Sequence, residues 1–314
     1  MIEDITVSQR AAQNLVGGLH GGGSPERERI AILGDTDLKE KIRLAEGLAG
    51  VSRGKRREKE MRFKDKVAIV TGGASGIGAA TARALAKEGA WVAVMDMDSP
   101  GLSKMESEMK QQGYPFLAVH GDVANETADE SLVKQAVSHF GGIDLLVNNA
   151  GISPKHRGKK ANLWEMDVGE WDRVMAVNIR GAFLCCHYAV PKMIERKGGA
   201  IVNVSSLAAK VGSVVTGCHY VISKAGIVGL TKILAREVAD YGIRVNAVAP
   251  GRIDTPMIWD VPPEVNEQYM KTIPLKRLGK PEDVADGILF LLSEAASYIT
   301  GLVLDVNGGL GMYY

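Results

Sequence analysis

The chain has 314 residues, enough for one large α/β domain or two smaller domains with a buried core. Hydrophobic residues make up 46% of it and charged residues 24%, as in an ordinary soluble globular protein. The formal net charge of +1 gives no electrostatic reason to expect a nucleic acid or an anionic membrane as partner. No apolar run approaches the roughly 18 residues of a membrane-spanning helix, and the N-terminus lacks the apolar stretch of a secretory signal. The sequence therefore predicts a cytoplasmic protein.

The cysteines and histidines give no support for a disulfide framework or a metal site. The three cysteines are an odd number, and two of them, Cys185 and Cys186, are adjacent and poorly placed to bridge each other. Cys218 is the third, and no pair forms a CxxC motif. The six histidines include no HExxH motif. We therefore expect free thiols and no metal.

Residues 1–61 differ in composition from the rest of the chain. They contain the glycine-rich stretch GGLHGGGSPERER and most of the charged run RGKRREKEMR at 53–62, which break any long periodic pattern. We expect a flexible extension here, followed by a single domain over residues 62–314. A regulatory or partner-binding arm and a translation start at Met61 are alternatives that the sequence leaves open.

From residue 62 onward, short apolar segments alternate with segments of helical period. The helical segments include 79–89, 130–141 and 223–242. Such alternation predicts an α/β fold with a doubly wound parallel sheet, helices on both faces, and ligands at the carboxyl ends of the strands. The seven expected strands are 66–73, 91–96, 116–123, 143–151, 200–206, 243–251 and 301–309.

The first expected strand runs into a glycine-rich turn, TGGASGIG at 71–78. Glycines let the backbone turn sharply and approach a pyrophosphate, while the following helix directs unpaired N–H groups at the anion. The spacing is GxxxGxG and no lysine follows it, which excludes a P-loop. We expect this turn to bind a dinucleotide through Gly72, Ser75, Gly76, Ile77 and Gly78.

Asp96 strengthens this interpretation because it ends the second expected strand, 18 residues after Gly78. A carboxylate at that place accepts hydrogen bonds from both adenosine ribose hydroxyls and repels a 2′-phosphate. The cofactor that we expect is therefore NAD rather than NADP.

Tyr220 and Lys224 lie four residues apart, on one face of an expected helix. The ammonium and a positive nicotinamide ring both favour the phenolate, which brings the pKa of Tyr220 down from about 10 toward working pH for acid–base catalysis. Tyr188 and Lys192 have the same spacing, but Pro191 lies inside that pair, and we interpret it as structural.

Ser206 ends the strand AIVNVSS, 14 residues before Tyr220, where its hydroxyl can orient a substrate oxygen. Its neighbour Ser205 is the alternative for this role. Asn178, in VNIRGAF, is the candidate to hold a water that connects Lys224 to solvent. The four candidate catalytic residues are thus Asn178, Ser206, Tyr220 and Lys224.

These residues, in this order, resemble the short-chain dehydrogenase/reductase superfamily over about residues 62–314. The resemblance implies a Rossmann fold, with Asp122 and Val123 at the adenine and Lys224 also at the nicotinamide ribose. It also implies homotetramers built through the helices that contain Asn178 and Tyr220. Further cofactor contacts implied by matching motifs are Asn149, Ala150 and Gly151 in NNAG, and Pro250, Gly251, Ile253 and Thr255 around the nicotinamide carboxamide.

Within the superfamily, the chain is most similar to 3-oxoacyl-(acyl-carrier-protein) reductases and related NAD-linked alcohol dehydrogenases. We expect hydride transfer between NAD(H) and a small carbonyl or secondary-alcohol substrate, foremost a 3-oxoacyl thioester. A cyclic alcohol, a steroid or a sugar acid is the alternative, and a non-catalytic NAD(H) sensor is a remote one. Met257, Ile258 and Trp259 are expected to give the substrate an apolar surface. Whether the basic loop at 155–160 contacts substrate or only solvent stays open.

Overall fold

Seven parallel strands form one sheet at the centre of the computed structural model, which describes residues 61–312. The extension expected over residues 1–61 lies outside this part of the chain, apart from Met61. The strand order is β3-β2-β1-β4-β5-β6-β7, so the direction of winding reverses between β1 and β4. The strands are β1 Val67–Thr71, β2 Trp91–Asp96, β3 Phe116–His120, β4 Leu145–Asn148, β5 Gly199–Val204, β6 Ile243–Pro250 and β7 Val303–Val306.

Each expected strand is confirmed, and the doubly wound fold with it. The central strands are continuous apolar runs because helices cover both faces of the sheet: every residue of β1, VAIVT, is buried. The expected segments reached several residues beyond the strands, as in 143–151 against β4 Leu145–Asn148. These extra residues form the loops at the carboxyl edge of the sheet.

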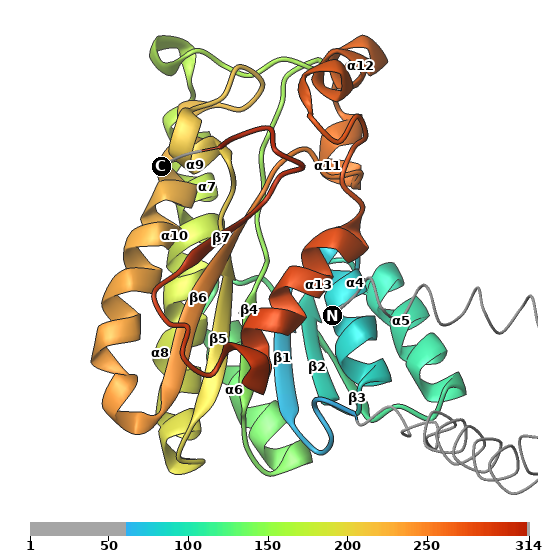
Figure 1. Cartoon of the computed structure of the whole chain (residues 1–314), viewed down its shortest axis with the longest axis vertical. Coiled ribbons are helices and arrows are strands. Elements are labelled where there is room, and N and C mark those ends of the chain that lie inside the picture. Colours follow the sequence, from blue (N-terminus) through green and yellow to red (C-terminus); the bar gives the residue numbers. More distant parts are fainter. Residues whose placement is uncertain (1–60, 313–314) are drawn as a thin grey trace, which may run out of the picture. The chain divides into compact units, whose positions relative to one another are not determined.

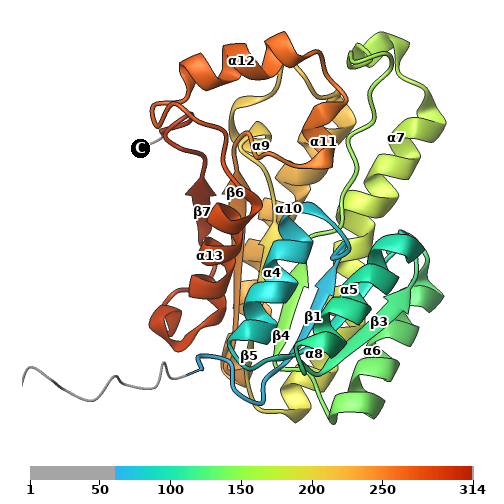
Figure 2. The ribbon, with the colours of Figure 1, turned by 90° about the vertical axis from the view of Figure 1, so that its right-hand side faces the viewer.

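Three helices pack on each face of the sheet (Figure 1). Helices α4 (Gly76–Lys87), α5 (Ser99–Gln111) and α13 (Pro281–Leu292) cover one face. Figure 2 shows them in front of the strands. The other face is covered by α6 (Glu126–Phe140), α8 (Gly181–Glu195) and α10 (Cys218–Glu237).

Shorter elements lie at the ends of the strands. Helices α11 and α12 follow β6 and sit above the carboxyl edge (Figure 1). Helix α7 leads through a single π-helical turn, η2, directly into α8. These elements are η1 Leu163–Glu165, α7 Val168–Met175, η2 Ala176–Arg180, α9 Ala208–Val211, η3 Ala239–Tyr241, α11 Pro256–Trp259, α12 Pro263–Thr272 and η4 Glu294–Ala296.

Two further observations concern residues 61–312 only. None of their helices combines the length and the apolar character that crossing a bilayer requires. No three His, Cys, Asp or Glu side chains in this range come together in a way that would hold a metal ion.

Candidate active site

A cavity of about 650 Å³ lies at the carboxyl edge of the sheet, where the winding direction reverses. Ligands of doubly wound folds bind at this kind of crevice. Of the residues predicted to be catalytic or cofactor-binding, only Gly78 and Asn178 do not line it. Those that do are Gly72, Ser75, Gly76, Ile77, Asp96, Asp122, Val123, Asn149, Ala150, Gly151, Ser206, Tyr220, Lys224, Pro250, Gly251, Ile253 and Thr255.

The glycine turn has room for a ligand, but two of its glycines have no room for a side chain. Gly72 has a positive φ of 63°, and a Cβ there would lie 2.7 Å from the Cα of Ala150. A Cβ on Gly78 would lie 2.1 Å from the carbonyl oxygen of Gly72, so Gly78 serves close packing of α4 against the turn. The cap residue Ser75 makes no side-chain hydrogen bond to α4, and the first N–H groups of a helix have no intrahelical partner. The turn therefore fits a pyrophosphate.

Asp96 holds this turn from the end of β2. Its carboxylate accepts one hydrogen bond from the backbone N–H of Ala74 at 2.9 Å and another from that of Asp98 at 3.0 Å. The first bond ties the carboxylate directly to the glycine turn. Because Asp96 also lines the cavity, its remaining lone pairs are available to ribose hydroxyls.

Asp122 forms an ion pair at the same end of the cavity. Its Oδ2 lies 2.7 Å from Nη1 of Arg173, which also lines the cavity. Burial tends to raise the pKa of Asp122, but the bonds from Arg173 and from the backbone of Ala124 outweigh it and lower the pKa. The carboxylate is therefore ionised and fixed in position.

The ends of β1 and β4 are joined beside the glycine turn. Asn149 donates from Nδ2 to the carbonyls of Thr71 at 3.0 Å and Gly72 at 2.8 Å. A Cβ on Gly151 would lie 3.1 Å from Nζ of Lys224 and 3.4 Å from Oδ1 of Asn178. This glycine therefore lets two of the candidate catalytic side chains approach the NNAG loop.

Tyr220 is almost fully buried where it lines the cavity. Burial raises the pKa of its phenol, and a hydrogen bond with Ser206 acts in the opposite direction. The sequence analysis expected Lys224 and the nicotinamide ring together to lower this pKa, and the side chains by themselves shift it in the opposite direction. The Lys224 ammonium lies 5.9 Å from the centre of the Tyr220 ring and donates to the carbonyl of Val204 at 2.8 Å.

Lys224 is itself changed by burial, which lowers its pKa to about 8. Ser205 fixes the helix at this point, because its hydroxyl donates to the backbone carbonyl of Lys224 at 2.8 Å. Ser206 lines the cavity beside Tyr220 and lowers the pKa of that phenol, whereas the hydroxyl of Ser205 is already used in its bond to the backbone.

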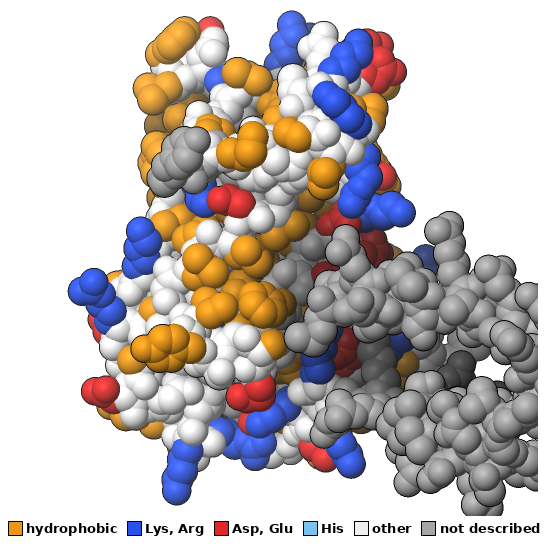
Figure 3. Space-filling model, in the orientation of Figure 1, with side chains coloured by type: hydrophobic (Ala, Val, Ile, Leu, Met, Phe, Trp, Pro, Cys, Tyr) orange, Lys and Arg blue, Asp and Glu red, His pale blue; other side chains and the backbone are white. Residues whose placement is uncertain are grey.

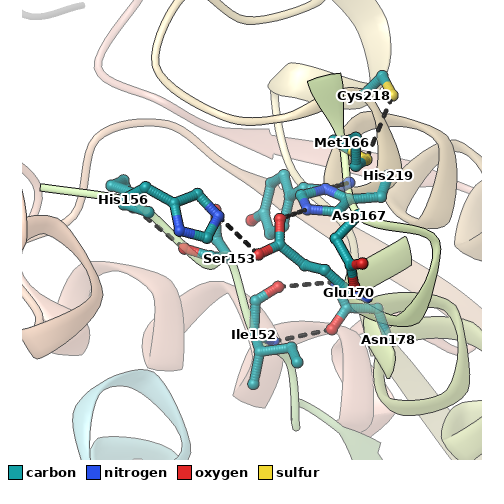
Figure 4. Close-up of polar contacts among 11 residues, drawn as sticks. Ile152, Ser153, His156, Met166, Asp167, Glu170, Asn178, Cys218 and His219 are labelled. Carbon is teal, nitrogen blue, oxygen red and sulfur yellow. Dashed lines mark hydrogen bonds and ion pairs between the residues drawn. The ribbon is translucent and has the colours of Figure 1, made fainter. Parts of the chain in front are cut away.

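Asn178 lies in the π-helical turn η2 and is buried. Its side chain pairs with the backbone of Ile152, accepting from N–H at 2.8 Å and donating to C=O at 3.0 Å, and it donates to Ser223 at 3.0 Å. Figure 4 shows the bonds to Ile152. Both amide hydrogens are thus committed, which leaves only acceptor atoms of Asn178 for the predicted water.

The substrate end of the cavity is formed partly as expected. Met257 and Ile258 line it, but the prediction for Trp259 is wrong, because this side chain is 65% exposed and donates from Nε1 to Asp254 at 3.0 Å. Lys155, from the basic loop, also lines the cavity, and so does Arg252, which the sequence analysis did not single out.

Two histidines, also missed from sequence, meet at Glu170 of α7 (Figure 4). His219 Nε2 lies 3.0 Å from Oε1 of Glu170, and His156 Nε2 lies 2.7 Å from Oε2. The backbone N–H of Tyr220 donates to Nδ1 of His219 at 2.7 Å. Since Nδ1 accepts, His219 carries its proton on Nε2 and donates it to Glu170. The basic loop is thereby linked to the helix of Tyr220.

The comparisons with known proteins agree with the fold. Residues 72–311 match the family described as enoyl-(acyl carrier protein) reductase. The chain is 43% identical over 247 residues to cis-4-hydroxycyclohexanecarboxylate dehydrogenase of Sinomonas cyclohexanicum, with 79% of this chain and 97% of that protein covered. It is 44% identical over 253 residues to a 3-oxoacyl-[acyl-carrier-protein] reductase of Thermotoga maritima, with 80% and 99% covered.

A solved structure of a related reductase has the same fold. The 3-oxoacyl-[acyl-carrier protein] reductase of Brucella melitensis with bound NAD is 41% identical, with a TM-score of 0.75, and the match covers 81% of this chain and 94% of that one. Residues 1–50 match a different family, described as 4-hydroxyphenylacetate 3-hydroxylase C terminal. The two matched ranges do not overlap, and residues 51–71 between them include the predicted boundary at residue 61.

Proposed function

Because the chain belongs to the short-chain dehydrogenase/reductase superfamily and is an oxidoreductase of secondary alcohols and ketones, we propose that Tyr220 exchanges the substrate proton while NAD(H) exchanges the hydride. The observation that carries this proposal is that Ser206, Tyr220 and Lys224 line one cavity together with the glycine turn, which leaves room for the pyrophosphate of a dinucleotide.

Tyr220 is the proton donor in the direction of ketone reduction. Burial keeps its phenol protonated, so it can give the proton to the substrate oxygen as the carbon accepts hydride. Ser206, hydrogen-bonded to the phenol, holds the same oxygen. Lys224 places a positive charge below the ring and stabilises the phenolate that the transfer leaves.

The proposed cofactor is NAD(H). The Asp96 carboxylate at the end of β2 disfavours a 2′-phosphate by charge repulsion. Arg173 is the cation at the same end of the cavity, and its ion pair with Asp122 commits it to a carboxylate rather than to a phosphate. The related reductase of Brucella melitensis was solved with bound NAD, which supports NAD(H) as the proposed cofactor.

Two substrate classes follow from the relatives. One is a 3-oxoacyl thioester, as in the name of the Thermotoga protein, and the other is a cyclic alcohol, as in the name of the Sinomonas protein. The apolar side chains of Met257 and Ile258 suit both an acyl chain and an alicyclic ring.

The proposal extends to assembly and organisation. We expect a cytoplasmic homotetramer built through α8 and α10, which expose Phe183, Ile222 and Ile233. Figure 3 shows further apolar side chains gathered over α13 and β7, where Phe290 and Leu302 are exposed. Light scattering on the purified protein tests the tetramer. Residues 62–314 should keep full activity once limited proteolysis has removed the segment before them.

The decisive experiment replaces Tyr220 by Phe and follows NADH oxidation with 3-oxobutyryl thioester and 4-oxocyclohexanecarboxylate. Loss of the proton donor should lower kcat by about 10²–10⁴-fold, while NADH binding measured by fluorescence survives. Tyr188→Phe is the matched control, because Tyr188 has the same YxxxK spacing but bonds Glu126 at the surface. A Tyr220→Phe enzyme as active as this control would refute the assignment.

A further inference from the structure

The substrate end of the cavity carries two cations without a carboxylate partner. Lys155 donates only to the backbone carbonyls of Ser153 and Met257, both at 3.3 Å. Arg252 donates from Nε and Nη2 to Oδ1 of Asn266, a neutral amide, at 2.9 and 2.6 Å. Neither forms an ion pair within residues 61–312, although both line the cavity. Carbonyl and amide oxygens satisfy hydrogen bonds but leave the positive charges unbalanced.

The two cations line the same cavity, and Arg252 is buried while Lys155 is half-buried. Arg252 is 8% exposed, and its guanidinium stacks 5.0 Å from the centre of the Tyr269 ring. Burial lowers the pKa of Lys155, and repulsion from Arg252 lowers it further, while the exposed Asp260 opposes this weakly. Like charges that are partly withdrawn from water repel each other, and a bound anion relieves this repulsion.

The surroundings suit one anionic group attached to an apolar body. Met257 and Ile258 line the cavity beside the cations. The hydroxyl of Ser153 is buried at the same cavity and has no hydrogen-bond partner within the described residues. By contrast, the cation at the adenine end, Arg173, is already paired with Asp122.

Hydrogen bonds also connect the loop that carries Lys155 to the helix that carries the proposed proton donor, Tyr220. Its neighbour His156 bonds Glu170, and Glu170 bonds His219, whose Nδ1 accepts the backbone N–H of Tyr220 (Figure 4). This chain of three bonds fixes the start of the basic loop against the helix that carries the phenol. A group bound by Lys155 is thereby positioned relative to the reacting carbon.

We propose that Lys155 and Arg252 bind a carboxylate of the substrate, so that the enzyme acts on an alicyclic keto or hydroxy acid rather than on a 3-oxoacyl thioester. This inference rests on the proposed function, since it assigns the substrate class of the same site. The cation pair takes the carboxylate, the apolar lining takes the ring, and the carbonyl oxygen faces Ser206 and Tyr220.

The test compares 4-oxocyclohexanecarboxylate with its uncharged carboxamide as substrates for NADH oxidation. The wild-type enzyme should prefer the acid, and Lys155→Gln should raise KM for the acid about 10- to 100-fold, as expected for a lost bond to a charged group. KM for the carboxamide should change by less than about 3-fold, since it makes no ion pair. Arg252→Gln should behave in the same way, and Arg252→Lys, which keeps the charge, should lose less.

Lys159→Gln is the matched control. Lys159 lies in the same loop, is exposed and does not line the cavity, so its loss removes one charge from the loop without touching the site. An equal effect of Lys159→Gln and Lys155→Gln would overturn the inference, because it would show long-range attraction only. Equal use of the acid and the carboxamide by the wild type would also overturn it.

Failure of the inference and failure of the proposed function give different results. If 3-oxobutyryl thioester is reduced and neither cyclic ketone is, the carboxylate site is wrong and the hydride-transfer function stands. If no ketone oxidises NADH, the proposed function is wrong. Calorimetry of cyclohexanecarboxylate binding to the NADH complex then tests Lys155 without turnover, and binding unaffected by Lys155→Gln would overturn the inference.

Discussion

Replacing Asp96 by Asn should shift the preference of the enzyme from NADH toward NADPH. In the proposed complex, the carboxylate accepts hydrogen bonds from the ribose hydroxyls, and bonds to a charged acceptor contribute about 1.5–3 kcal/mol each. Losing the charge should therefore raise KM for NADH about 10- to 100-fold. The Asp96 carboxylate and the 2′-phosphate of NADPH, about 4 Å apart, would repel each other by about 1–4 kcal/mol, depending on the local dielectric. Removing the carboxylate charge should strengthen NADPH binding by about this amount.

The two effects act on opposite cofactors, so the ratio of kcat/KM for NADPH to that for NADH should rise by about 10²–10⁵-fold. An Asn side chain keeps one acceptor oxygen, whereas the carboxylate of Asp96 binds two backbone N–H groups, those of Ala74 and Asp98. One of these two bonds is lost, which should cost about 1 kcal/mol of stability and lower Tm by a few degrees. Measuring Tm separates this cost from the change in preference.

Asp98→Asn is the matched control for this experiment. It removes the same charge two residues away, and Asn caps the helix α5 as well as Asp does, through the acceptor that Gly101 N–H now uses at 3.1 Å. Since Asp98 is exposed, salt screens its charge. The reasoning is refuted if Asp96→Asn leaves the cofactor ratio unchanged, or if Asp98→Asn shifts it equally.

Two further predictions concern stability. Gly78→Ala places a Cβ 2.1 Å from a backbone oxygen and should destabilise the fold by about 1–3 kcal/mol. Urea unfolding measures this loss, and a free energy of unfolding equal to that of the wild type would contradict the packing argument. Burial raises the pKa of Asp129 to about 7, so the native state binds a proton that the unfolded state releases above its ordinary pKa of 3.8, and stability falls as pH rises between these values. This pKa shift corresponds to about 4 kcal/mol of unfolding free energy between the two pH values. Asp129→Asn should remove most of this dependence on pH. If the free energy of unfolding of wild type and variant changed with pH in parallel, Asp129 would not be the cause.

Much of the fold was predictable because buried parallel strands have a local signature. Apolar β-branched runs such as VAIVT in β1 end in glycine or asparagine, and each such end carries residues that now line the cavity. Tyr220 and Lys224 were predictable because a spacing of four residues fixes one helical face. These are properties of short segments, which sequence alone defines.

The remaining features depend on contacts between distant segments. The bond between Glu170 and His219 joins residues 49 positions apart, and no local pattern marks either one. Arg252 follows a recognisable Pro-Gly pair, but its charge matters only because the fold brings Lys155 to the same cavity. Burial, a property of the whole fold, outweighs the hydrogen bond with Ser206 and raises the pKa of Tyr220, whereas the sequence showed only the neighbouring ammonium.

The π-helical turn at Ala176–Arg180 has a consequence for the phase of the helix behind it. One extra residue in a helix turns everything that follows by about 100°, so this turn decides which side of α8 faces the sheet. The side that faces inward carries Cys185, Cys186, Ala189 and Met193. Deleting a single residue here would rotate α8 so that polar positions face the interior. The same deletion would also displace Asn178. Loss or gain of one residue should therefore be tolerated far less in this turn than in the surface loop at 155–160.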